Sequence, residues 1–143
     1  MDNVTRYEKI RFLYQQQIAD RNLWSSEMEN SIFELLEALS IALGTKVEHY
    51  CALYLQDSEL PIDQEVIEAH YFSGKLPITM NIELPFGPTS AYELNFALVF
   101  KEKQMRVYDC APLYAGETYT DVKALAHLIV DQIEQQASYR LVD

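Results

Sequence analysis

The 143-residue chain contains 22 acidic and 11 basic side chains, which give it a net charge of −11, and 49% of its residues are hydrophobic. This length and composition predict one globular domain, residues 1–143, rather than a disordered segment. The acidity disfavours direct binding to nucleic acid or to an anionic membrane, because contacts to phosphate groups require Lys and Arg.

Residues 1–6 lack the basic region and apolar core that begin a signal peptide. No apolar run approaches the roughly 20 residues that span a bilayer. The two cysteines are too few for a disulfide framework. We therefore expect a cytoplasmic protein.

The N-terminal third of the chain predicts two helices. Residues Thr5–Glu8 have the form of a capping box, and apolar residues then recur at helical spacing, so a first helix is predicted from about Arg6 to Ala19. Ser26–Glu29 is a second capping box, and Gly44 supplies a helix stop. The stripe of this second helix comprises Met28, Ile32, Leu35, Leu36, Leu39, Ala42 and Leu43.

The next segment, Lys46–Gln56, alternates as a strand, and Asp57–Asp63 is predicted to be a loop. Gln64–Phe72 fits two structures. Its alternating apolar residues indicate an edge strand, whereas Asp63 could cap a short helix that Gly74 ends. We predict the strand, because aromatic residues favour strands and Lys46–Gln56 needs a hairpin partner.

The centre of the fold is predicted to be Leu76–Cys110, a run of three antiparallel strands. Leu76–Leu84 and Tyr92–Phe100 carry an apolar side chain at every second position, which is the period of a strand with one buried face. Met105–Cys110 follows after a short charged turn.

The register of the last two strands depends on that turn. A two-residue turn would place Phe100 opposite Met105 and Leu98 opposite Val107. Tyr108 would then point away from the core, and Asp109 would lie beside Phe96 on the apolar side.

A last helix is predicted after Thr118 or Thr120, either of which could cap it. Its stripe comprises Val122, Leu125, Ala126, Ile129, Ile133 and Ala137. The fold class is therefore α+β: an antiparallel sheet of four to five strands arranged as a meander, packed with two N-terminal helices and one C-terminal helix.

The chemically reactive residues form no recognisable catalytic or metal-binding motif. His49 and Cys51 share a strand face, but a zinc site needs three or four ligands. Cys110 and His127 could form a nucleophile and its base, yet no signature of a cysteine hydrolase surrounds them. The acidic loop after residue 56 lacks the glycine of an EF-hand. We therefore expect no enzyme, metal or cofactor.

Acidic and tyrosine side chains carry the functional prediction. No basic residue lies between Lys46 and Lys75, and such a field attracts basic proteins. Tyrosine is enriched at protein-binding surfaces. The candidate partner-binding residues are Tyr50, Tyr54, Asp57, Glu59, Asp63, Glu65, Glu68 and Tyr108.

We therefore expect a small acidic protein-binding module that binds a basic partner protein, as an inhibitor, an immunity protein or a chaperone does. Two alternatives remain open. The chain could be a small enzyme or ligand-binding domain with a pocket between sheet and helices. It could also be a homodimeric assembly component.

Overall fold

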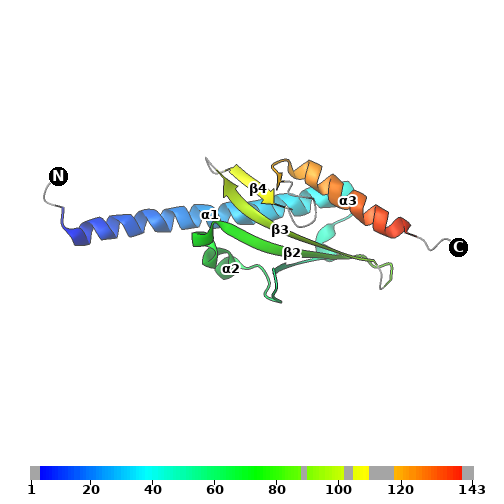
Figure 1. Ribbon diagram of the computed structural model, residues 1–143, viewed down its shortest axis with the longest axis horizontal. Helices are drawn as coiled ribbons and strands as arrows, with labels where there is room; N and C mark the ends of the chain where they lie inside the picture. The colour runs from blue at the N-terminus through cyan, green and yellow to red at the C-terminus, as the bar shows by residue number, and fades with distance from the viewer. Residues whose placement is uncertain (1–3, 88–89, 102–104, 110–117, 140–143) are drawn as a thin grey trace.

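In the computed structural model (Figure 1), the described residues are 4–87, 90–101, 105–109 and 118–139. Their secondary structure confirms the α+β class, with an antiparallel sheet and three α-helices. The elements in chain order are helix α1 (Arg6–Leu43), 3-10 turn η1 (Val47–His49), strand β1 (Cys51–Leu55), helix α2 (Gln64–Ala69), 3-10 turn η2 (Tyr71–Ser73), strands β2 (Lys75–Glu83), β3 (Ala91–Lys101), β4 (Met105–Asp109) and β5 (Thr118–Tyr119), and helix α3 (Val122–Ser138).

The five strands lie in the order β1-β2-β3-β4-β5, and each neighbouring pair is antiparallel. The sheet is therefore the predicted meander. Alternate side chains of β2 and β3 are buried, as their sequence pattern predicts. This inner face comprises Leu76, Ile78, Met80 and Ile82 of β2 with Tyr92, Leu94, Phe96 and Leu98 of β3.

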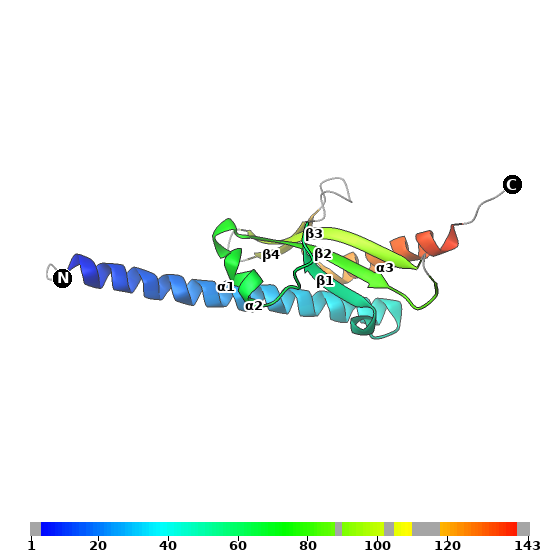
Figure 2. The same ribbon diagram turned by 90° about the horizontal axis from the view of Figure 1, so that it is seen from below.

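Helices α1 and α3 lie against each other and share one hydrophobic core with the inner face of the sheet. From α1, the core receives Met28, Leu35 and Leu39; from α3, it receives Leu125 and Ile129. Among the described residues, no helix covers the opposite face of the sheet (Figures 1 and 2). The N-terminal part of α1 extends beyond the sheet as an arm (Figures 1 and 2).

The prediction of two N-terminal helices is wrong, because α1 runs unbroken for 38 residues. Ser26, the expected cap of a second helix, lies exposed inside α1. No Gly or Pro occurs between residues 20 and 26, so nothing in that stretch ends the helix.

Both outer ends of α1 are confirmed. The Oγ1 atom of Thr5 accepts a hydrogen bond of 3.2 Å from the Glu8 amide. At the C-terminus, Gly44 has φ 83° and its amide donates to the Ser40 carbonyl at 2.9 Å. A left-handed residue of this kind ends a helix with little strain only when it is glycine.

The segment Gln64–Phe72 is helix α2 followed by η2, so the predicted edge strand is wrong. The alternative holds: Oδ1 of Asp63 accepts from the Val66 amide at 2.9 Å, and Gly74 ends the turn with φ 67°. The first residues of the predicted strand Lys46–Gln56 form η1, and β1 takes only Cys51–Leu55, pairing with β2.

The register between β3 and β4 differs by one residue from the prediction. Leu98 pairs with Tyr108 and Val99 pairs with Val107, so the connection is three residues long rather than two. Side chains directly opposite each other in an antiparallel pair share a face, and Leu98 is buried. Tyr108 therefore faces the core, whereas Asp109 lies opposite Ala97 on the outer face.

Helix α3 is capped by Asp121, not by Thr118 or Thr120. Its Oδ1 accepts hydrogen bonds from the amides of Lys123 and Ala124 at 3.0 and 3.3 Å, and Thr118 lies in β5. Most of the predicted stripe is buried, but Ala137 is exposed.

Candidate functional site

The outer face of the sheet carries the side chains that alternate with the buried ones along β1, β2 and β3. Tyr54 of β1 lies opposite Thr79 of β2, which in turn lies opposite Asn95 of β3. The adjacent row consists of Ala52, Asn81 and Glu93. These side chains are exposed or half-buried. Around these six residues, the face is thus a polar surface rather than a second core layer.

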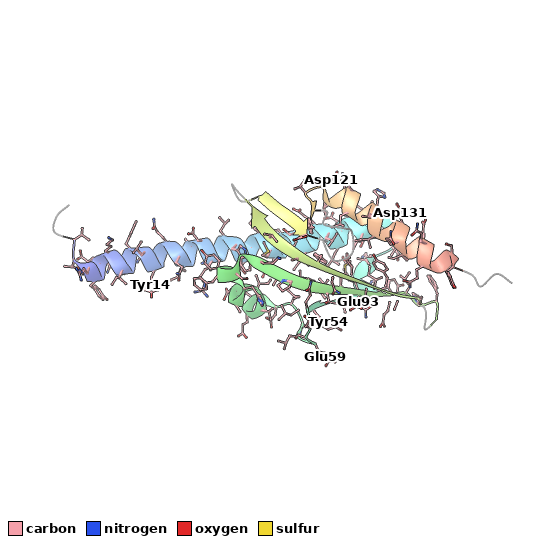
Figure 3. All side chains as sticks on the ribbon, in the orientation of Figure 1. Tyr14, Tyr54, Glu59, Glu93, Asp121 and Asp131 are labelled. Carbon is pink, nitrogen blue, oxygen red and sulfur yellow. The ribbon has the colours of Figure 1, made fainter. Side chains whose placement is uncertain are left out.

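Two adjoining hollows lie on this face, of about 360 and 260 Å³. Both are lined by Tyr54 and Asn81, so they meet at the edge strand β1. The floor of the first is held by a 2.6 Å hydrogen bond from Oγ1 of Thr79 to Oδ1 of Asn95. Figure 3 shows Tyr54 and Glu93 in this region, with Glu59 at the outer edge of the loop that follows β1.

The hollows carry negative charge. Asp57 and Glu93 line the first hollow, and Glu83 lines the second, while no Lys or Arg occurs among the described residues of either lining. Within the described residues, the only side chain in these linings that can become positively charged is His49. Several carboxylates around a shallow depression favour a positively charged ligand.

The turn after β1 is fixed by Gln56. Its Nε2 donates to the carbonyls of Ile78 and Phe96 at 3.2 and 3.0 Å. Asp57 follows with φ 59°, a left-handed conformation that Asp tolerates better than most residues. Next, the Leu55 amide donates to the Leu60 carbonyl at 2.9 Å, which folds the loop back along the edge of β1. These bonds hold the Asp57 carboxylate at the rim of the hollow.

Two of the predicted partner-binding residues, Tyr54 and Asp57, therefore lie together on the outer face. Glu59 is exposed in the same loop. Tyr50 lines the second hollow and is also partly packed against the core.

The other predicted acidic residues lie on or next to α2. Asp63 caps this helix, Glu65 is exposed, and Glu68 accepts a 3.2 Å hydrogen bond from Nε2 of Gln64. Helix α2 contacts α1, and Asp63 lines a hollow between them together with Glu29. The acidic residues thus lie on two surfaces, the outer sheet face and the side of α2 next to α1.

Tyr108 does not belong to an exposed surface, so its place among the candidates is a correction. The side chain is 3% exposed, and its hydroxyl donates to the Ser31 carbonyl of α1 at 2.8 Å. The ring packs near Phe96, with centroids 6.3 Å apart. The three-residue connection before β4 causes the difference, because a shift of one residue moves every side chain of a strand to the other face.

Of the candidate reactive residues, His49 and Cys51 both line the second hollow. Burial raises the pKa of the Cys51 thiol from 9.0 to about 11, so the thiol is neutral at physiological pH. His127 is exposed on α3, and Cys110 lies outside the described residues. Within the part of the chain that the structure describes, no three His, Cys, Asp or Glu side chains are placed to hold a metal ion.

A third hollow, of about 800 Å³, lies between the ends of β2 and β3 and the last turns of α3. Its described lining combines apolar side chains with Gln132, Gln135 and Gln136, and none of these described residues is charged. The side-chain Nε2 of Gln136 donates to the Ala91 carbonyl at 2.6 Å across this gap. Such a lining suits an uncharged ligand or an apolar side chain of a partner.

Thr79, Asn81, Glu93 and Asn95 were not among the predicted site residues. The sequence did contain a signal for them, because they are the polar members of two alternating strands whose apolar members form the core. A second signal is their central position: both strands have neighbours on each side, which gathers these polar side chains in the middle of one face.

No protein-family model matches the chain, and neither a curated protein nor a solved structure matches it. Among the helices of the described residues, none combines the length and the apolar character needed to cross a membrane.

Proposed function

We propose that the protein is an acidic protein-binding module that binds a basic segment of a partner protein on the outer sheet face. The binding surface consists of the two hollows that meet at Tyr54 and of the loop Asp57–Glu59. A Lys or Arg side chain of the partner enters a hollow between the carboxylates, and the Tyr54 ring packs along its aliphatic or guanidinium part.

One observation carries this proposal: Tyr54 shares one hollow with Asp57 and Glu93 and the other with Glu83, and no described Lys or Arg lines either hollow. The chain as a whole is also acidic, with a net charge of −11. A field of this kind speeds the encounter with a basic protein and suppresses binding of acidic ones. Inhibitors, immunity proteins and chaperones that act on basic proteins would use such a surface.

The hollow between the β2–β3 end and α3 favours a second function, the binding of a small uncharged ligand. Its volume of about 800 Å³ lies within the range of small-molecule sites. None of the described residues that line it is a carboxylate, Lys or Arg, which favours binding over acid–base chemistry. Phe86 and Tyr139, which are 80% and 79% exposed, are the side chains that a ligand there would cover.

The first function is tested with a charge-reversal variant, Glu59→Lys with Glu93→Lys. Both side chains are exposed, and neither caps a helix. Asp63→Lys is unsuitable, because it would remove the cap of α2 and so confuse binding with stability. The matched control is Asp131→Lys with Glu134→Lys, which makes the same change in net charge on the exposed side of α3.

Tagged wild-type protein, the variant and the control are used to capture proteins from native lysate at low and high salt. We expect basic proteins on the wild type and on the control, released by salt, and absent from the variant. Capture of the same proteins by the wild type and by the Glu59→Lys, Glu93→Lys variant would refute the proposed surface.

A further inference from the structure

The N-terminal arm of α1, residues 6–23, has an apolar stripe that nothing in the described residues covers. Figures 1 and 2 show the arm extending away from the sheet and the other helices. Its stripe side chains are between 52% and 75% exposed. They are Tyr7, Ile10, Leu13, Tyr14 and Ile18. Most helical stability in proteins comes from packing of such a face, so an arm of this kind indicates an interface.

A hollow on the body of the protein follows the arm, beyond a stretch of α1 that η2 covers on one side: Arg21 lies 5.8 Å from the centre of the Phe72 ring, and Trp24 and Ser25 are buried. Between α1 and α2 lies a hollow of about 370 Å³, lined on the α1 side by Glu29, Ile32, Phe33 and Leu36. Ile18 and Glu29 are eleven residues apart, which is close to three helical turns. Glu29, which lines the hollow, therefore lies on the same side of the helix as Ile18.

The charges on α1 are divided between its two halves. The arm carries four basic and two acidic side chains: Arg6, Lys9, Arg11 and Arg21 against Glu8 and Asp20. The remainder of the helix, residues 24–43, carries four acidic side chains and no basic one: Glu27, Glu29, Glu34 and Glu37. Asp63 adds a further carboxylate to the hollow beside α2.

This distribution of charge along α1 determines which partner is complementary to the arm. A basic protein would be repelled by the arm, and a parallel second helix would bring like charges together. An antiparallel second copy places each basic arm against the acidic half of the other helix. Because a two-fold interface uses the same patch twice, a helix with one basic and one acidic half is complementary to itself.

We propose that two copies of this chain form an antiparallel dimer, in which the arm of each copy lies over the α1–α2 hollow of the other. Arg11 lies opposite Glu29, and Tyr7 then lies opposite Phe33, since both are four residues further from the centre of the pair. Phe33 is 63% exposed in the single chain, so the contact covers it as well as the arm.

The area is sufficient for a stable dimer. At about 100 Å² for each of the five stripe side chains, an arm would bury on the order of 500 Å². Two arms and the surfaces under them then bury about 2,000 Å², which lies at the upper end of the standard range for stable interfaces.

The test is sedimentation of full-length protein at several concentrations and two salt concentrations. We expect twice the chain mass of 16.6 kDa at about 100 µM, with a dissociation constant that rises with salt. Arg11→Glu and Glu29→Arg should each weaken the dimer about tenfold, because each brings two like charges together. The double variant, Arg11→Glu with Glu29→Arg, restores the attraction and should return the dissociation constant to within about threefold of the wild type.

Two control variants match the single charge changes away from the interface: Lys123→Glu and Glu134→Arg, both exposed on α3. These should leave the dissociation constant unchanged. Circular dichroism of all variants checks that α1 is retained. A wild-type protein that stays at 16.6 kDa at about 100 µM overturns the proposal, even if the arm then captures a different protein. A dimer that the single reversals do not weaken, or that the double variant does not restore, also overturns it.

Discussion

Replacing Tyr108 by Phe tests the packing of α1 on the sheet and the register of β4 at once. The change removes only the hydroxyl that donates to the Ser31 carbonyl at 2.8 Å, in a side chain that is 3% exposed. The ring itself remains, so no cavity forms. What is lost is one buried hydrogen bond between the sheet and the first helix.

The magnitude follows from the burial of both groups. A hydrogen bond of this kind contributes about 1 kcal/mol net, and a carbonyl left buried without this donor costs somewhat more. The Ser31 carbonyl lies inside a helix, where a carbonyl also accepts from the amide four residues on, which limits the loss. We expect the free energy of unfolding to fall by about 1–1.5 kcal/mol. Tyr108→Ala should cost about 3–5 kcal/mol, because it also empties the space of the ring.

The assay is urea unfolding followed by the fluorescence of Trp24, which is 3% exposed and therefore reports on the core. All variants are compared at one protein concentration, because association would add to the apparent stability. The control is Tyr54→Phe on the outer face, where we expect a change below about 0.5 kcal/mol. If Tyr108→Phe and Tyr54→Phe unfold at the same urea concentration, the Tyr108 hydroxyl faces solvent and the register of β4 is wrong.

Two further variants test local features of the fold. Ser26→Ala should raise the free energy of unfolding by a few tenths of a kcal/mol, because Ala is the better residue inside a helix; a loss of about 1 kcal/mol would mean that Ser26 caps a separate helix. Burial raises the pKa of the Cys51 thiol from 9.0 to about 11, so the folded state favours the neutral thiol. The stability that the neutral thiol contributes is complete below pH 9 and is lost as the pH rises towards 11. In a Cys110→Ser variant, Cys51 is the one remaining cysteine. Its alkylation rate should increase up to about pH 11 in native protein but level off near pH 9 in urea. Equal pH profiles in the two conditions would show that Cys51 is not buried.

The central strands could be predicted from the sequence because their signal is local. Leu76–Leu84 and Tyr92–Phe100 alternate so regularly that the buried face follows from the sequence pattern alone. The end of α1 at Gly44 could also be predicted, since glycine is the usual residue in the left-handed conformation that ends a helix.

The errors arose where two local signals compete or where a long-range contact decides. Ser26–Glu29 has the form of a capping box wherever it occurs, but it starts a helix only if the preceding residues are not already helical. In Gln64–Phe72, the Asp63 cap outweighs the strand preference of the aromatic residues. The β3–β4 register depends on a connection without Asn-Gly or Asp-Gly, so its length was not specified by the turn sequence.

The candidate site was predicted in part. Tyr54, Asp57 and Glu59 could be named because charge density and aromatic content are visible along the chain. Glu93 could be recognised only as a polar member of an alternating strand, and neither Glu83 nor Glu93 could be placed beside Tyr54, because their proximity depends on the pairing of three strands. Tyr108 was misplaced by one residue of register, which is enough to move a side chain from the surface to the core.

The central claim is that the outer sheet face binds basic segments of proteins, and the most direct measurement is an NMR titration. A short oligo-lysine peptide is added to isotope-labelled full-length protein, and the backbone amide shifts are followed at low salt. We expect the largest shifts at Tyr54, Asp57, Asn81 and Glu93, and loss of those shifts at high salt. Shifts spread evenly over the acidic surface, or concentrated on α3, would contradict the claim.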